Sequence, residues 1–169
     1  MTLTDKVALR MGARLTPPER VLHAVPAGPF AGARDVTGPG FTERGWLVLA
    51  CAQGVLDRSG SPPRSDSSLP LPERCVIALT DRRLSLYSNA ALVHAPVDLV
   101  YDVPLDQVAW IGASTRESRT ARSQRAAAGL SRGSLLAWEF ARLYLAPGRA
   151  LIADLALLVA GGAVPGPAA

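Results

Sequence analysis

The chain has 169 residues and 49% of them are hydrophobic, which suits one domain and excludes global disorder. Its formal net charge is +4. The five arginines and single glutamate within residues 114–133 account for the whole excess, so the chain is not a globally basic nucleic-acid binder.

The composition also indicates a source and a compartment. Arginine and alanine are abundant and Lys6 is the only lysine, as in proteins from GC-rich bacterial genomes. Charged residues from Asp5 to Arg10 interrupt the N-terminal apolar run, so it does not resemble a signal peptide. The most apolar run, residues 151–164, is too short to span a bilayer and contains Asp154. We expect a cytoplasmic protein, with a peripheral position at the inner membrane face as the alternative.

Residues 4–15 predict a short helix. Thr4 is a suitable N-cap, and three apolar residues recur on one face behind it: Val7, Met11 and Leu15. The Pro17-Pro18 pair ends this helix.

The remaining chain predicts strands, then one helix. The strand candidates are residues 20–25, 46–56, 75–80, 83–88, 98–103, 107–113 and 135–146. For the run 46–56 a helix stays open as the alternative. For the run 135–146 the alternative is one long helix through residue 160. Pro147 and Gly161 favour a separate helix between them, because proline suits a first turn and glycine a helix end.

Residues 75–88 carry the most informative pattern. Two short alternating strands flank Asp81 and Arg82, which we interpret as a two-residue turn. That turn length sets the register and gives one apolar face with the facing pairs Leu79–Leu84 and Ile77–Leu86.

Three stretches resemble those of bacterial pleckstrin-homology-like (PH-like) domains, close to the GRAM-like group. They are residues 19–22, 76–84 and 103–108. The resemblance implies a mainly β fold: a seven-stranded, bent antiparallel sheet or partly open barrel, capped by a C-terminal helix. The expected organisation is an N-terminal helical extension (1–18), a PH-like domain (19–160) with mobile loops near 28–45, 57–73 and 114–133, and a disordered tail (161–169).

The resemblance also implies a non-catalytic module that binds lipid headgroups, peptides or protein surfaces. The sequence contains no nucleotide-binding or serine-nucleophile motif. His23 and His94 have no neighbours at metal-ligand spacing. We therefore expect no enzyme activity, cofactor, metal or small-molecule substrate. Cys51 and Cys75 are expected to be buried free thiols.

Two groups of arginines are candidate partner or anion sites. Arg116, Arg119, Arg122 and Arg125 are spaced by three, which on a helix gives a basic stripe suited to an anionic membrane or a phosphate backbone. The alternative is a solvated loop that joins two strands. Arg82 and Arg83 lie at the hairpin tip, where they could meet a phosphate or a carboxylate. The alternative is structural, with Asp81 bonding the turn and Thr80 paired with Arg83.

These features favour a protein-protein binding or scaffold module, with another protein or a second copy as partner. The alternative is docking on anionic lipid through residues 116–125, and contact with nucleic acid through the same segment is a weaker one. Three tryptophans in the strand candidates are expected in the core or at the barrel rim: Trp46, Trp110 and Trp138.

Overall fold

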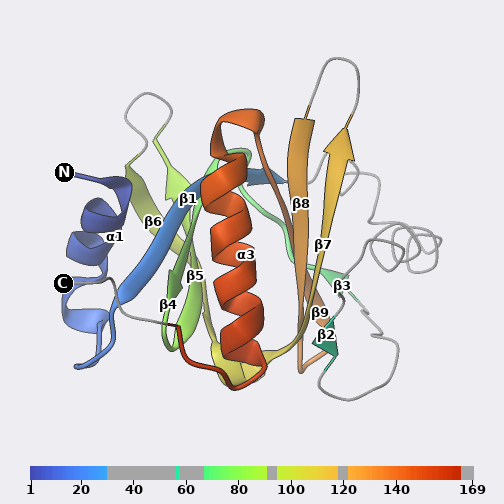
Figure 1. Cartoon of the computed structure of the whole chain (residues 1–169). Helices are drawn as coiled ribbons and strands as arrows, with labels where there is room; N and C mark the ends of the chain where they lie inside the picture. Colours follow the sequence, from blue (N-terminus) through green and yellow to red (C-terminus); the bar gives the residue numbers. More distant parts are fainter. Residues whose placement is uncertain (30–55, 58–66, 91–94, 118–121, 165–169) are drawn as a thin grey trace.

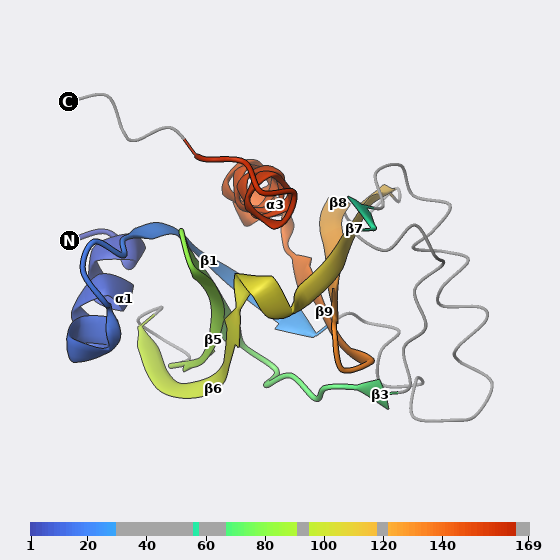
Figure 2. The same cartoon turned by 90° about the horizontal axis from the view of Figure 1, so that it is seen from below.

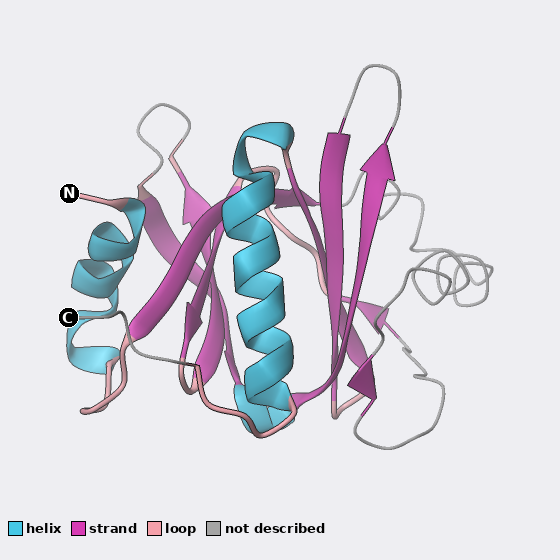
Figure 3. Ribbon diagram, viewed as in Figure 1, coloured by secondary structure: helices cyan, strands magenta, loops and turns pink. Residues whose placement is uncertain are grey.

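A computed structural model describes residues 1–29, 56–57, 67–90, 95–117 and 122–164. Within these residues, seven long strands form a bent antiparallel sheet, with one helix at each end of the chain (Figures 1 and 3). The long strands are β1 (Val21–Pro29), β4 (Cys75–Thr80), β5 (Arg83–Asn89), β6 (Pro96–Pro104), β7 (Val108–Glu117), β8 (Arg122–Leu130) and β9 (Ser134–Phe140).

The strands follow the order β7-β8-β9-β1-β4-β5-β6, and β1 joins the two halves of the sheet. Residues from Val21 to Ala27 pair with β4, whereas Gly28 and Pro29 pair with β9. Two short strands add to this path: β2 (Leu56–Asp57) pairs with β7, and β3 (Ser67–Ser68) pairs with β9. No pairing joins β6 to β7 in the described part of the chain, so the sheet is not closed.

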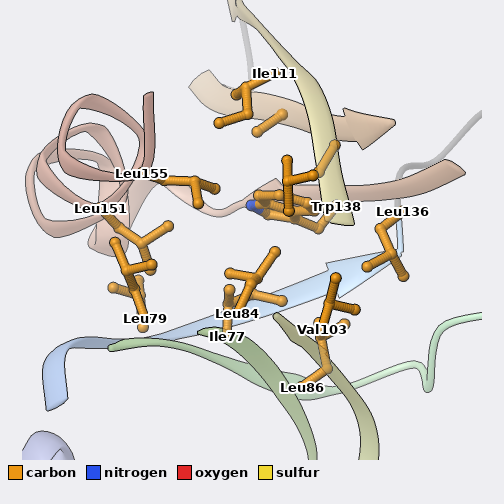
Figure 4. Close-up of a cluster of buried hydrophobic side chains, with 14 of the residues drawn as sticks. Ile77, Leu79, Leu84, Leu86, Val103, Ile111, Leu136, Trp138, Leu151 and Leu155 are labelled. Atoms are coloured by element: carbon orange, nitrogen blue, oxygen red, sulfur yellow. The ribbon is translucent and has the colours of Figure 1, made fainter. Parts of the chain in front are cut away.

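Helix α3 (Leu145–Val159) covers the opening between the two halves of the sheet (Figure 2). Leu151 and Leu155 are fully buried and point into the core that the two halves enclose, toward Leu79 and Trp138 (Figure 4). The helix ends before Gly161, whose φ of 85° is a left-handed conformation that favours glycine. This arrangement confirms the predicted mainly β class: a seven-stranded, bent and open antiparallel sheet with a C-terminal helix and a short N-terminal helix.

The predicted hairpin is confirmed in its turn and its register. Strands β4 and β5 are separated by Asp81 and Arg82, and the facing pairs are Leu79–Leu84 and Ile77–Leu86. These four side chains lie in the main core, as their alternation predicts. The opposite face of the hairpin is buried as well, since Val76, Ala78 and Tyr87 pack beneath the N-terminal helix.

The N-terminal helix α1 (Leu3–Met11) confirms the helix predicted over 4–15, with corrections at both ends: Gly12, whose φ is 40°, ends it early, and a 3-10 turn follows over Gly12–Arg14. The N-cap is Thr2, not Thr4. The Thr2 hydroxyl accepts the Asp5 N–H at 3.1 Å, and the Asp5 carboxylate accepts the Thr2 N–H at 2.6 Å, which makes a capping box. Val7 and Met11 face the sheet, as the helical spacing predicts.

The prediction of a loop across residues 114–133 is wrong for most of that segment. Residues 114–117 belong to β7, and residues 122–130 form β8, which pairs with both of its neighbours. The strand satisfies its backbone by pairing on both sides, and its small residues fit against two tryptophans. Ala126 of β8 faces Trp138, and Gly129 of β8 lies opposite Trp110, so the small residues leave room for the indole rings.

The last predicted strand is too long. Strand β9 ends at Phe140, and the 3-10 turn η4 (Arg142–Tyr144) leads into α3, which starts at Leu145. Pro147 therefore lies in the first turn of the helix, where its missing N–H costs nothing. The predicted run 46–56 lies outside the described residues except for Leu56.

Candidate functional site

Arg83, one of the two hairpin-tip candidates, is paired with two carboxylates. Its Nε and Nη2 atoms donate to Glu19 Oε1 and Oε2 at 2.8 and 3.0 Å, and its Nη1 donates to Asp102 Oδ2 at 3.0 Å. The bidentate geometry is the strong form of this contact. Arg83 of β5 therefore joins the segment before β1 to β6, and its charge is already matched.

Glu19 is the buried member of this network, with a fully buried side chain. Burial raises the pKa of the Glu19 carboxyl, but hydrogen bonds from Arg83, the Thr80 hydroxyl and the Thr16 N–H outweigh it, and the net pKa is below its usual value. The Thr80 hydroxyl donates to Glu19 Oε1 at 2.7 Å. The carboxylate is thus held in its charged form.

The turn itself is closed by Thr80 rather than by Asp81. The Thr80 hydroxyl accepts the N–H groups of Arg82 and Arg83 at 3.1 and 2.9 Å. The prediction that Asp81 bonds the turn backbone is wrong: its Oδ1 accepts the N–H of Arg20 at 3.2 Å, which ties the turn to the start of β1. Arg82 is exposed and stays available to a partner.

The arginine segment does not form a helical basic stripe. Positions three apart fall on alternate faces of a strand, so the predicted periodicity has no single face on β7 and β8. Arg125 lies opposite Glu139 of β9, and its Nε is 3.4 Å from Glu139 Oε2. Its side chain is only 13% exposed. Arg116 and Arg122 lie in β7 and β8, and Arg119 lies outside the described residues.

The outward face of α3 is a surface that the sequence patterns did not single out. Four exposed residues recur there at i, i+4, i+7 and i+11, here called the α3 stripe: Ala146, Ala150, Ala153 and Leu157. The Leu157 side chain is 41% exposed. A surface helix normally presents charged residues to water, whereas this stripe has none. The signal in the sequence was the scarcity of charge, since only Arg149 and Asp154 are charged between residues 145 and 159.

Both charged residues of α3 contact the sheet, and Arg149 is also exposed at the flank of the stripe. Asp154 Oδ2 lies 2.6 Å from His23 Nε2 on β1, and Arg149 Nε donates to Gln124 Oε1 on β8 at 3.2 Å. The two contacts lie on opposite flanks of the helix. Arg149 and Asp154 therefore flank the α3 stripe, whose own four residues carry no charge.

A second surface feature lies between α1 and the edge of the sheet. A hollow of about 330 Å³ is lined by Arg10, Arg14, Tyr87, Asp98 and Leu99. Arg10 donates from Nη2 to the Val97 carbonyl, which anchors the C-terminal half of α1 to β6. The hollow therefore combines cationic, phenolic, acidic and apolar groups.

The thiol and aromatic predictions agree with the described structure. Cys75 is a free, fully buried thiol, and burial raises its pKa to about 12. Trp110 and Trp138 are buried, whereas Cys51, Trp46 and His94 lie outside the described residues.

His23 lies on β1 beside Asp154. The described residues contain no group of three or more His, Cys, Asp or Glu placed to hold a metal ion.

No described helix combines the length and the apolar character needed to cross a membrane.

No family model and no curated protein matches the chain. Among solved structures, the chain is similar to the crystal structure of a pleckstrin homology domain from Shewanella amazonensis, with 14% sequence identity and a TM-score of 0.47. The similarity covers 90% of this chain and 96% of that chain.

Proposed function

We propose that this protein is a non-catalytic scaffold module that associates with a second copy of itself through the α3 stripe. The observation that carries the proposal is the α3 stripe, four exposed uncharged residues flanked by the exposed Arg149, which bonds to Gln124, and by Asp154, which lies against His23. An exposed apolar face gains free energy when a matching surface covers it.

The α3 stripe is complementary to itself in an antiparallel arrangement. The centre of the stripe lies between Ala150 and Ala153, so a two-fold axis there brings Leu157 of one copy against Ala146 of the other. A large side chain then meets a small one on each side of the axis. The alanines allow close approach of the two helices, and no like charges meet. One helix pair is a small interface, so we expect a weak dimer that forms with rising concentration.

Sedimentation equilibrium across a range of protein concentrations tests the proposal. The wild type should show a monomer–dimer equilibrium, and Ala153→Glu or Leu157→Glu should remain monomeric because each places a charge in the interface. Glutamate is a good helix former, so α3 should stay intact. Leu9→Glu is the matched control, since Leu9 is 75% exposed on α1. A wild type that stays monomeric throughout, or an Ala153→Glu dimer, would refute the proposal.

Docking on anionic lipid is less well supported, because Arg125 is already paired with Glu139. Flotation with anionic vesicles compares the wild type with a variant in which Arg116, Arg119, Arg122 and Arg125 are all serine. We expect neither protein to float. Salt-sensitive flotation that only the wild type shows would instead favour the membrane function.

A further inference from the structure

The hollow beside α1 is lined by two arginines that come from the end of the helix and from the turn after it. Arg10 lies in the last turn of α1, and Arg14 ends the 3-10 turn η1 (Gly12–Arg14) that follows it. Both residues are exposed, and neither forms an ion pair with a carboxylate in the described part of the chain. The hollow thus contains two positive charges that no described acidic residue neutralises by direct contact.

The opposite wall comes from the sheet. Tyr87 of β5 is 2% exposed, and Asp98 and Leu99 belong to β6. Burial is the main reason that the pKa of Tyr87 is raised, and the nearby Asp102 carboxylate adds to it, while Arg14 and Arg10 act in the opposite direction. The phenol is therefore protonated at neutral pH and lies within the electrostatic range of both guanidiniums.

We propose that this hollow binds a small phosphomonoester that carries an ammonium group a few bonds away. Arg10 and Arg14 contact the phosphate oxygens, and Asp98 accepts from the ammonium. A phosphomonoester carries nearly two negative charges and three acceptor oxygens. Two guanidinium groups therefore suit a phosphomonoester better than they suit a carboxylate, which has one charge and two oxygens. The charge of the lining groups, two positive and one negative, favours a ligand with the reverse distribution.

The size and the walls of the hollow fit the same class of ligand. A volume of about 330 Å³ is at the small end of ligand pockets and holds a molecule of few heavy atoms. Leu99 supplies an apolar contact for the carbon linker between the two charged groups. This inference concerns a different surface from the α3 stripe and does not depend on self-association.

The test is an NMR titration with phosphoethanolamine, which has a phosphomonoester and an ammonium joined by two carbons. Saturable shifts are expected at the Arg10 and Arg14 Nε–H signals and at the Leu99 amide. Inorganic phosphate should bind more weakly, and ethanolamine should not bind. Arg14→Gln should weaken phosphoethanolamine by about tenfold, the usual effect of losing one charge-assisted hydrogen bond. Arg82→Gln removes an exposed arginine elsewhere and should leave the affinity unchanged.

Asp98→Asn separates this proposal from simple anion attraction. It should weaken phosphoethanolamine but strengthen inorganic phosphate, because it removes both the ammonium acceptor and a negative charge. Absence of saturable shifts in the wild type would refute the proposal. So would equal affinity in the Arg14→Gln variant, or an Asp98→Asn variant that strengthens both ligands alike.

Discussion

Glu19 and Arg83 form a doubly hydrogen-bonded ion pair, with Arg83 Nε 2.8 Å from Glu19 Oε1 and Nη2 3.0 Å from Oε2. The two residues are 64 positions apart in the chain. Glu19 precedes β1 and Arg83 begins β5, so the pair reaches across β4, the strand between them. It links the entry of the domain to the central hairpin.

Replacing Glu19 by Gln should destabilise the fold. The change removes the bidentate acceptor of Arg83 from a fully buried position, and breaking one partner of a buried pair typically costs about 3 kcal/mol. Urea denaturation at pH 7 measures the free energy of unfolding. Arg82→Gln is the control, because Arg82 is exposed and adjacent in sequence, and it should change stability by less than about 0.5 kcal/mol. Equal stability of the Glu19→Gln variant and the wild type would show that the Glu19–Arg83 pair makes no net contribution to the free energy of unfolding.

The contribution of Glu19 to the free energy of unfolding should depend on pH. The pKa of its carboxyl is lower in the folded protein than the ordinary value of 4.5, since the hydrogen bonds from Arg83 and Thr80 outweigh burial. The folded state therefore binds the proton less readily than the unfolded state does. The stabilisation is fully present above the unfolded pKa and is lost as the pH falls through the folded pKa. Denaturation curves from pH 7 down to pH 3 should show the difference between wild type and Glu19→Gln shrinking. A difference that stays constant over this range would contradict the linkage.

Gly129→Ala should destabilise the β7–β8 pair. A Cβ at position 129 would lie 1.7 Å from Trp110 Nε1, so the indole has to move from its buried place across β8. Overpacking of this kind costs about 1–3 kcal/mol. A double-mutant cycle with Trp110→Ala isolates the cause, because alanine at position 129 should cost much less when the indole is absent. The same cost in both backgrounds would assign the effect to backbone conformation instead.

Cys75 should resist thiol reagents in the native protein. Its side chain is fully buried and burial raises its pKa to about 12, so almost none of it is thiolate at pH 8. Alkylation followed by peptide mass spectrometry measures labelling at Cys75 itself. Labelling should be complete in denaturant and should follow global unfolding in buffer. Rapid labelling of Cys75 under native conditions would mean that β4 opens locally.

The features predicted correctly are those that a local period determines. In the hairpin, a two-residue alternation together with a two-residue turn leaves one register that buries Leu79 with Leu84. In α1, a helical spacing identifies Val7 and Met11 as the packed face. Pro147 and Gly161 delimit the last helix, because each residue suits a helix end whatever surrounds it.

The sequence could not predict which candidate arginines are free to bind a partner. That depends on contacts with residues far away in the chain, and a local sequence pattern does not contain them. The spacing of the arginines predicted a helical stripe or a loop, but residues 122–130 form a strand paired with β7 and β9, in which Gly129 lies opposite Trp110 and Ala126 opposite Trp138. Arg83 and Arg125 could not be recognised as paired from the sequence, since Glu19 and Glu139 reach them only through strand pairing.

The sequence by itself therefore determined the elements with a clear local period, their apolar faces and the mainly β architecture, but it did not determine β8. Only the tertiary structure decided which charged groups are matched and which surfaces stay open. Ion pairing needs atoms a few ångströms apart, and an uncovered face such as the α3 stripe exists only once the opposite face of that helix has been packed against the sheet.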